Sequence, residues 1–186
     1  LSTIQTLIKN GHTDEALSFT QKLTESIAVE MSAINTNHPV VNAILNQKYR
    51  SMQEKHIAVI LKVGDLQEIC LEEEEIVILL SNLLDNAIEG TQRVRSSESP
   101  FISLAFARTY DVFHIVCKNT CNPKTIRFVN HSWLSSKTND SRSETHGVGI
   151  HSIERIINNA QGYSSFSVDG CTFIAELTIP FLVSNN

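Results

Sequence analysis

The sequence contains no long apolar run. No stretch of its 186 residues approaches the roughly 18 consecutive apolar residues that a membrane-spanning helix needs, and Leu1 does not begin a signal peptide. We therefore expect a soluble chain. Because it starts with Leu rather than Met, we also expect it to be part of a longer protein, in which a membrane segment can lie upstream.

Positive charge is scarce as well. The 15 Lys and Arg residues stand against 20 Asp and Glu residues, so the net charge is −5 and the pI is near 5.8. No run of Lys or Arg interrupts this balance. Because general nucleic-acid binding requires a basic surface, this composition argues against a nucleic acid as the partner.

The four cysteines are few and scattered. Only Cys117 and Cys121 lie close together, and this pair has no partner cysteines or histidines at the spacing of a zinc site. The pattern favours a reduced, cytosolic chain with mostly buried thiols over a disulfide framework or a metal site.

The first 35 residues are predicted to form a separate helical unit. Apolar residues at helical spacing predict one helix over 1–10 and another over 13–34, with a turn at Gly11 between them. Such an antiparallel hairpin is too small to bury its apolar faces alone. We expect it to pair with a second copy as a homodimer; packing on the rest of the same chain is the alternative.

A polar linker from Asn35 to Pro39 predicts the domain boundary, with domains at 1–35 and 36–186. The second domain is predicted to follow the order helix 39–55, strand 56–63, helix from 72–75 to about 90, strands 101–108 and 112–118, loop 119–145, helix 146–160, strands 163–168 and 171–179. The acidic run Glu72–Glu75 predicts the start of the second of these helices, because carboxylates favour the positive end of the helix dipole. Strands clustered apart from helices predict an α+β fold, a two-layer α/β sandwich with helices on one face of a mixed sheet.

Two asparagines interrupt the most apolar helix. Asn82 and Asn86 are four residues apart, so they share one helix face. Beside them lies the predicted apolar stripe of the helix: Leu79, Leu80, Leu83, Ala87 and Ile88. Asparagine prefers caps and turns, which suggests that something other than the backbone uses these amides. A side-chain carbonyl is an oxygen ligand that Mg²⁺ accepts when phosphates complete its shell. The alternative is that both amides fix a loop.

Glycines precede a helix later in the chain. Gly147 and Gly149 would let backbone N–H groups approach an anion at the helix start, although a tightly packed turn would also select glycine. The long loop 119–145 before them is predicted to be a lid or binding loop. Its Trp133 either pins the loop to the core or stacks on a ligand.

Together, Asn82-x-x-x-Asn86-Ala87, the loop and Gly147-x-Gly149-Ile150 resemble the ATP-binding domain of the GHKL superfamily, which includes histidine kinases, gyrase and mismatch-repair ATPases. Within it, the stretches 37–46, 82–89 and 146–153 resemble the quorum-sensing receptor kinases of Gram-positive bacteria, of the accessory-gene-regulator and competence kind. The resemblance implies ATP and Mg²⁺ as cofactors and residues 1–35 as a truncated dimerisation and phosphotransfer hairpin.

The resemblance also implies roles for single residues. The residues assigned to ATP are Asn82, Asn86, Asn119, Lys137, His146, Gly147, Val148, Gly149 and Ile150, and Asn86 is also the Mg²⁺ ligand. Lys137 would contact a phosphate or remain a solvated loop lysine, and Glu89 is a further polar contributor to the site. Asn119 replaces the Asp that accepts the adenine amino group in the family, and Thr145 replaces a hinge glycine of the lid. The first departure predicts weaker binding of adenine, and the second predicts a lid that hinges differently from the family's.

The family activity is transfer of the γ-phosphate of ATP to a histidine and then to an aspartate of a response regulator. None of the seven histidines here is followed by Asp or Glu, as the family's phosphoacceptor is. We expect the acceptor upstream of Leu1, so that this fragment binds ATP without autophosphorylating, as the cytoplasmic portion of a membrane-anchored receptor. The alternatives are a GHKL ATP hydrolase, which would carry a glutamate base at position 82, and a non-enzymatic dimerisation module with a decayed site.

Overall fold

The computed structural model of the chain describes residues 13, 34–66, 68–94, 99–109, 111–129, 132–135 and 148–180. The chain divides into two compact units, Leu1–Asn35 and Thr36–Asn186. The predicted helical hairpin and its dimer interface lie outside the described residues, which belong almost entirely to the second unit.

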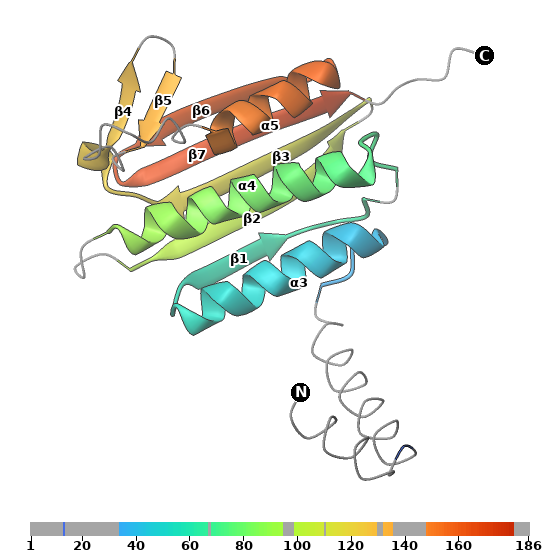
Figure 1. Cartoon of the computed structure of the whole chain (residues 1–186), viewed down its shortest axis with the longest axis horizontal. Helices are drawn as coiled ribbons and strands as arrows, with labels where there is room; N and C mark the ends of the chain where they lie inside the picture. The colour runs from blue at the N-terminus through green and yellow to red at the C-terminus, as the bar shows by residue number, and fades with distance from the viewer. Residues whose placement is uncertain are drawn as a thin grey trace. The chain divides into compact units, whose positions relative to one another are not determined.

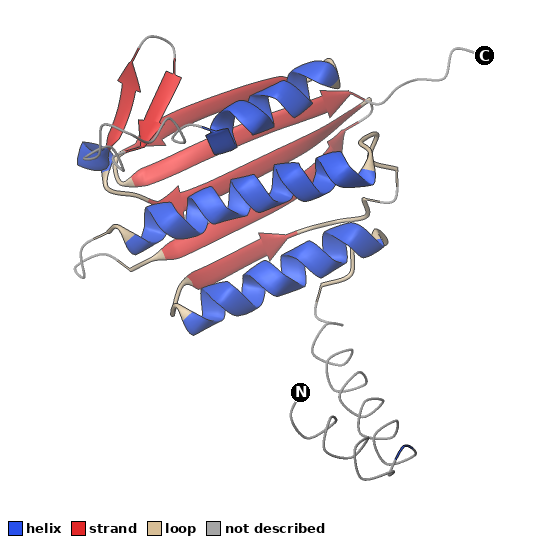
Figure 2. Ribbon diagram, in the orientation of Figure 1, coloured by secondary structure: helices blue, strands red, loops and turns tan. Residues whose placement is uncertain are grey.

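The second unit is a mixed sheet with helices on one face (Figures 1 and 2). Its elements are α3 Pro39–Glu54, β1 Ala58–Lys62, α4 Glu73–Gln92, β2 Phe101–Thr109, β3 Val112–Thr120, η1 Pro123–Thr125, β4 Ile126–Val129, β5 Ser132–Ser135, α5 Val148–Asn159, β6 Tyr163–Asp169 and β7 Thr172–Pro180. The five-stranded sheet has the order β1-β2-β3-β7-β6. Strand β1 pairs with β2 in parallel, and the other three pairings are antiparallel. The predicted two-layer sandwich is therefore confirmed.

The core lies between α4 and the middle of the sheet. Alternate residues of β3, namely Phe113, Ile115 and Cys117, are at most 1 % exposed because β-strand side chains alternate between faces. The α4 residues that form the predicted apolar stripe are all buried: Leu79, Leu80, Leu83, Ala87 and Ile88. Burial of one such Leu or Ile side chain contributes about 1.5–3 kcal/mol to folding, so this packing fixes α4 on the sheet.

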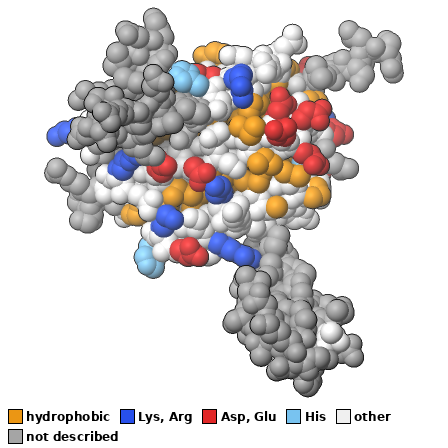
Figure 3. All heavy atoms as spheres, in the orientation of Figure 1, with side chains coloured by type: hydrophobic (Ala, Val, Ile, Leu, Met, Phe, Trp, Pro, Cys, Tyr) orange, Lys and Arg blue, Asp and Glu red, His pale blue; other side chains and the backbone are white. Residues whose placement is uncertain are grey.

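The start of α4 is set by its glutamates, as predicted. Glu72 is the N-cap, and its backbone N–H donates to Glu75 Oε2 at 3.2 Å while the Glu72 side chain accepts from the backbone of Glu75. Figure 3 shows acidic side chains gathered around this end of the helix. Carboxylates in the first turn interact favourably with the helix dipole, by about 0.3–1 kcal/mol each. None of the described helices is long and apolar enough to cross a membrane.

The prediction of a long loop over 119–145 is wrong in part. Strand β3 runs on to Thr120, and β4 pairs with β5 as a separate two-stranded sheet in which Phe128 lies opposite Trp133. The two strands have four residues each, too few for an apolar period to be visible in the sequence. Trp133 therefore belongs to a hairpin. The rest of the predicted lid, residues 130–131 and 136–145, lies outside the described part of the chain.

Candidate functional site

The first turn of α5 lies directly against the asparagines of α4. A Cβ atom placed on Gly149 would be 3.1 Å from Asn86 Nδ2, 3.2 Å from Asn86 Oδ1 and 3.4 Å from Asn82 Oδ1. Such contacts are tighter than real Cβ atoms usually make, so a larger residue would push the amides aside. The structure thus brings together three of the predicted site residues, which come from positions more than sixty residues apart.

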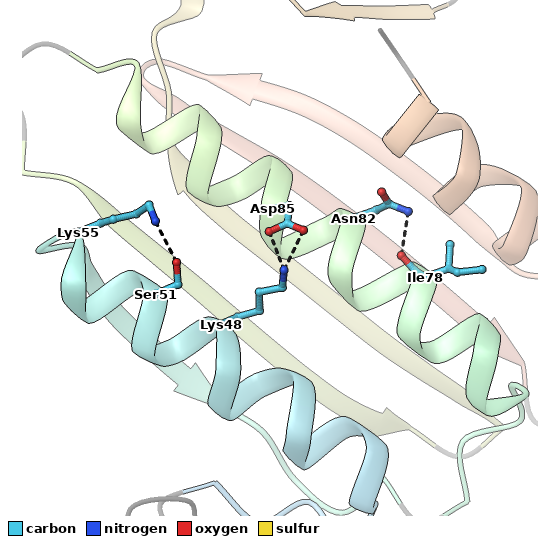
Figure 4. Close-up of polar contacts among 6 residues, drawn as sticks. All are labelled: Lys48, Ser51, Lys55, Ile78, Asn82 and Asp85. Carbon is cyan, nitrogen blue, oxygen red and sulfur yellow. Dashed lines mark hydrogen bonds and ion pairs between the residues drawn. The ribbon is translucent and has the colours of Figure 1, made fainter. Parts of the chain in front are cut away.

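Asn82 is held by its own helix. Its Nδ2 donates to the carbonyl oxygen of Ile78, one turn earlier, at 2.9 Å (Figure 4). The backbone therefore uses the donor half of this amide, contrary to the expectation that something else uses it. With its nitrogen engaged in this way, Asn82 turns its Oδ1 toward Gly149, at 3.4 Å from a Cβ atom placed there. The hydrogen bond orients an acceptor toward the start of α5.

Two acidic residues of α4, Asp85 and Glu89, form ion pairs away from the asparagines. Asp85 forms an ion pair with Lys48 of α3, with Nζ at 2.7 and 2.8 Å from its two carboxylate oxygens (Figure 4). Glu89, predicted as a polar contributor, forms an ion pair with Arg93 at 3.3 Å one turn further along α4. Both pairs are partly exposed, so each adds little to stability. Neither carboxylate lines the pocket between α4, α5 and the sheet.

This pocket is a shallow depression, and the space around it that no atom fills, with the open solvent at its mouth counted in, is about 250 Å³. Its lining residues are Leu83, Asn86, Ala87, Cys117, Asn119, Ile150, Ile153, Phe166, Phe173 and Ala175. The rings of Phe166 and Phe173 are stacked with centroids 6.3 Å apart. Apart from the carboxamides of Asn86 and Asn119 the lining is apolar, which is the chemistry that a flat, mostly apolar ring with a few polar groups contacts.

Asn119 is a buried polar residue of the pocket lining. It is 3 % exposed, and its Nδ2 donates to the carbonyl oxygen of Thr120 at 2.9 Å. A Cβ atom on Gly90 would lie 2.8 Å from that nitrogen. The sequence predicts the end of this helix at about Gly90, but α4 continues to Gln92. An isolated glycine inside a helix often has a packing reason, and here the reason is room for Asn119.

Cys117 lies beside Asn119 in the pocket lining. Burial raises the pKa of the Cys117 thiol from 9.0 to about 12, because a thiolate loses its hydration in an apolar surrounding. At neutral pH this side chain is thus an uncharged thiol. Cys117 therefore forms part of the pocket wall and does not act as a nucleophile.

The remaining predicted residues divide into two groups. Ile150 lines the pocket, and Val148 begins α5, where the first backbone N–H groups of the helix have no partner within it. Lys137, His146 and Gly147 lie outside the described residues. Of the described residues, Asn86, Asn119 and Ile150 line the pocket, while Asn82 and Gly149 lie close to each other and to Asn86.

A resident metal centre does not fit the described residues, among which no group of three or more His, Cys, Asp or Glu side chains could hold a metal ion. A Mg²⁺ ion that arrives on phosphates has a different requirement. It keeps most of its water and phosphate oxygens and needs only one or two ligands from the protein. The carboxamide oxygens of Asn86 and Asn82, beside the start of α5, fit this second kind of site.

Comparison with known proteins identifies the family. The model of the GHKL domain matches residues 71–180, which is more than half of the chain. The chain therefore belongs to the GHKL family, as its motifs predicted. No curated protein sequence matches it.

Solved structures with similar folds are histidine kinases. The catalytic domain of histidine kinase ThkA is 15 % identical with a TM-score of 0.56, over 79 % of this chain and 93 % of that one. The histidine kinase AdeS of Acinetobacter baumannii is 15 % identical with a TM-score of 0.56, over 100 % of this chain and 93 % of that one. The histidine kinase domain of the blue-light activated kinase EL346 of Erythrobacter litoralis is 13 % identical, with a TM-score of 0.53, over 80 % and 64 %. At these identities the likeness shows a common fold.

Proposed function

We propose that this chain is the ATP-binding catalytic part of a sensor histidine kinase of the quorum-sensing type. One observation supports this proposal above the others: a single apolar pocket has Asn119 among its lining residues and reaches Asn86, where Gly149 brings the start of α5 against the carboxamides. A nucleotide needs an apolar surface next to a polar one, because its base is flat and largely apolar while its phosphates need hydrogen-bond donors and a cation.

The base would lie in the pocket with its amino group at Asn119. Since the Nδ2 of Asn119 donates to the Thr120 carbonyl, its Oδ1 is the atom left to accept from an exocyclic amino group. A neutral hydrogen bond of this kind contributes about 0.5–1.5 kcal/mol, roughly half of what a carboxylate would give. This supports recognition of adenine with reduced affinity.

The phosphates would lie at the first turn of α5. Backbone N–H groups at a helix start bind anions, and the Oδ1 atoms of Asn86 and Asn82 stand beside them. Mg²⁺, when bound with the phosphates, would neutralise charge that develops during transfer. By resemblance we assign His146 and Gly147 to the same phosphates, and Lys137 as a point charge.

Asn82 favours a kinase over a hydrolase. A hydrolase needs a general base to activate water, and the resemblance puts that base at position 82. The carboxamide of Asn82 cannot accept the proton, and its nitrogen is engaged with Ile78 O. The site would therefore hold ATP without rapid hydrolysis and present the γ-phosphate to a histidine.

The histidine and the remaining partners are part of the proposal. We place the phosphoacceptor upstream of Leu1, residues 1–35 in a dimerising helical hairpin, and residues 36–186 in the catalytic domain. The phosphate would pass to a response regulator, and the membrane anchor would belong to an upstream sensor domain. The resemblance of stretches 37–46, 82–89 and 146–153 supports the peptide quorum-sensing context.

Incubation of an upstream-extended chain with γ-labelled ATP and Mg²⁺ tests the proposal. We expect an acid-labile label on a histidine before Leu1, and no label in an Asn86→Ala variant. Release of free phosphate without a labelled histidine would indicate a hydrolase. Absence of nucleotide binding altogether would indicate a decayed site.

A further inference from the structure

Two cysteines that are fifty residues apart in sequence lie opposite each other at the end of the sheet. Strands β3 and β7 are antiparallel, and their last register pair is Thr120 with Thr172. The backbone N–H of Cys121 donates to the carbonyl oxygen of Cys171 at 2.7 Å, which extends the same register by one residue on each side. Cys121 and Cys171 are therefore cross-strand neighbours.

The backbone holds this pair at a spacing that a disulfide accepts. Opposite residues in a hydrogen-bonded antiparallel pair have Cα atoms about 5.5 Å apart, and disulfides form at Cα separations of about 4.4–6.8 Å. Cys171 also belongs to the tight connection between Asp169 and Thr172, which pair with each other. Gly170 starts this turn with φ +54°, the conformation that lets two residues join β6 to β7.

The two thiols differ in access. Cys171 is exposed, whereas Cys121 is 1 % exposed. A reagent from solution therefore reaches Cys171 first, whereas Cys121 is shielded from solvent. This is the arrangement of an attacking thiol beside a resolving thiol.

We propose that Cys121 and Cys171 form a reversible intramolecular disulfide when the chain meets a low-molecular-weight disulfide. The Cys171 thiolate attacks one sulfur of that molecule, so that a mixed disulfide forms and one small thiolate leaves. The Cys121 thiolate then attacks the Cys171 sulfur and displaces the second small thiolate. Each cysteine loses one proton and each leaving thiolate gains one, so the protein is oxidised by two electrons and the small disulfide is reduced to two thiols.

A metal site is the less suitable interpretation of this pair. Soft metals such as Zn²⁺ take four ligands in structural sites. Among the residues that the structure describes, no third His, Cys, Asp or Glu joins the two cysteines in a possible metal site. Two cysteines on neighbouring strands are too few for such a metal site but are sufficient for a disulfide.

The pair is close to the pocket. Asn119 stands two residues before Cys121 and Phe173 stands two residues after Cys171, and both line the pocket. Opposite Cβ atoms in such a sheet are about 4.5–5.5 Å apart, but a disulfide draws them to about 3.8 Å. Oxidation would therefore pull this end of β3 toward the β6–β7 turn and shift Asn119. This consequence rests on the proposed function, whereas the disulfide itself does not.

Peptide mapping after exposure to oxidised glutathione tests the proposal. Trypsin cuts at Lys118, Lys124 and Arg155, so Cys121 falls in peptide 119–124, Cys171 in 156–186, Cys117 in 109–118 and Cys70 in 63–93. We expect peptide 119–124 linked to 156–186 in the monomeric chain, with the link lost on addition of dithiothreitol. The same product should form in Cys70→Ser and be absent in Cys121→Ser and in Cys171→Ser.

Two results would overturn the proposal: a stable glutathione adduct on Cys171 that Cys121 never displaces, or a link between two chains. The effect on the pocket is measured separately, as the affinity of oxidised and reduced chain for Mg-ATP. We expect about threefold to tenfold weaker binding after oxidation, the equivalent of one disturbed hydrogen bond. If neither form binds ATP, the proposed function fails while the mapped disulfide stands.

Discussion

Gly149 and Asn86 touch across two helices, with so little space between them that a single added methyl group would lie 3.1 Å from the carboxamide nitrogen. The contact is maintained by the core, because Ile153, Ile156 and Ile157 hold α5 on the sheet at no more than 3 % exposure. The geometry of the site is therefore a property of the packed fold.

Gly149→Ala should weaken nucleotide binding without unfolding the chain. The new methyl group displaces the carboxamides of Asn82 and Asn86 by a few tenths of an ångström, while alanine is favoured over glycine in a helix by about 1 kcal/mol. We expect about threefold to tenfold lower affinity for Mg-ATP by titration calorimetry and an unchanged or higher melting temperature. Gly64→Ala is the matched control, since a Cβ there meets nothing within 4 Å. Equal affinities of the two variants would contradict the assignment.

Gly90→Ala should destabilise the fold through Asn119. Its methyl group would lie 2.8 Å from Asn119 Nδ2 and break the hydrogen bond to Thr120 O. An unsatisfied buried carbonyl costs about 1–3 kcal/mol, against a gain of about 1 kcal/mol in helix propensity. The measurement is the free energy of unfolding in urea of four proteins that form a double-mutant cycle: the parent chain, Gly90→Ala, Asn119→Ala and the double variant.

In the Asn119→Ala background the clash is gone, so Gly90→Ala should there be neutral or stabilising. A change of sign between the two backgrounds would show that Gly90 and Asn119 are coupled. The same loss of stability in both backgrounds would refute the contact.

Cys117 should make the chain less stable in alkali. Its pKa is raised to about 12 in the folded chain, against 9.0 for an ordinary thiol. Below pH 9 the thiol is protonated in both states and has no effect. Between pH 9 and pH 12 the unfolded chain loses the proton first, so stability falls as the pH rises, by on the order of 1 kcal/mol at pH 10.

The comparison is the free energy of unfolding of the parent chain and of Cys117→Ala at pH 7 and at pH 10. The variant should have the lower stability at pH 7, because it leaves a cavity, but it should lose less between the two pH values. An identical loss in both proteins would show that Cys117 does not titrate abnormally.

Much of the fold followed from the sequence because its elements have clear periods. The β2–β3 and β6–β7 hairpins were visible as alternating strands around short turns, and α4 as an apolar stripe with acidic residues at its start. In each case the local residue pattern agrees with the burial in the folded chain, so the sequence alone was sufficient to predict these elements. The GHKL family was likewise predicted from motifs that the fold brings together.

The features that were missed depend on contacts between distant segments. The reason for a glycine at position 90 is the space that Asn119 needs, and Asn119 comes from strand β3. Cys121 and Cys171 become neighbours only through the register of β3 and β7. The β4–β5 hairpin is too short for a period to show. The ion pair of Asp85 with Lys48 similarly required the packing of α3 on α4.

Calorimetric titration of three proteins with Mg-ATP tests the central claim most directly: the parent chain, Asn86→Ala and Asp85→Asn. Asp85 neighbours Asn86 in sequence but pairs with Lys48 outside the pocket, and breaking such a partly exposed pair costs at most about 1 kcal/mol of stability. We predict saturable, Mg²⁺-dependent binding by the parent chain and by Asp85→Asn, and its loss in Asn86→Ala. Binding that survives Asn86→Ala, or that the parent chain lacks, would contradict the account.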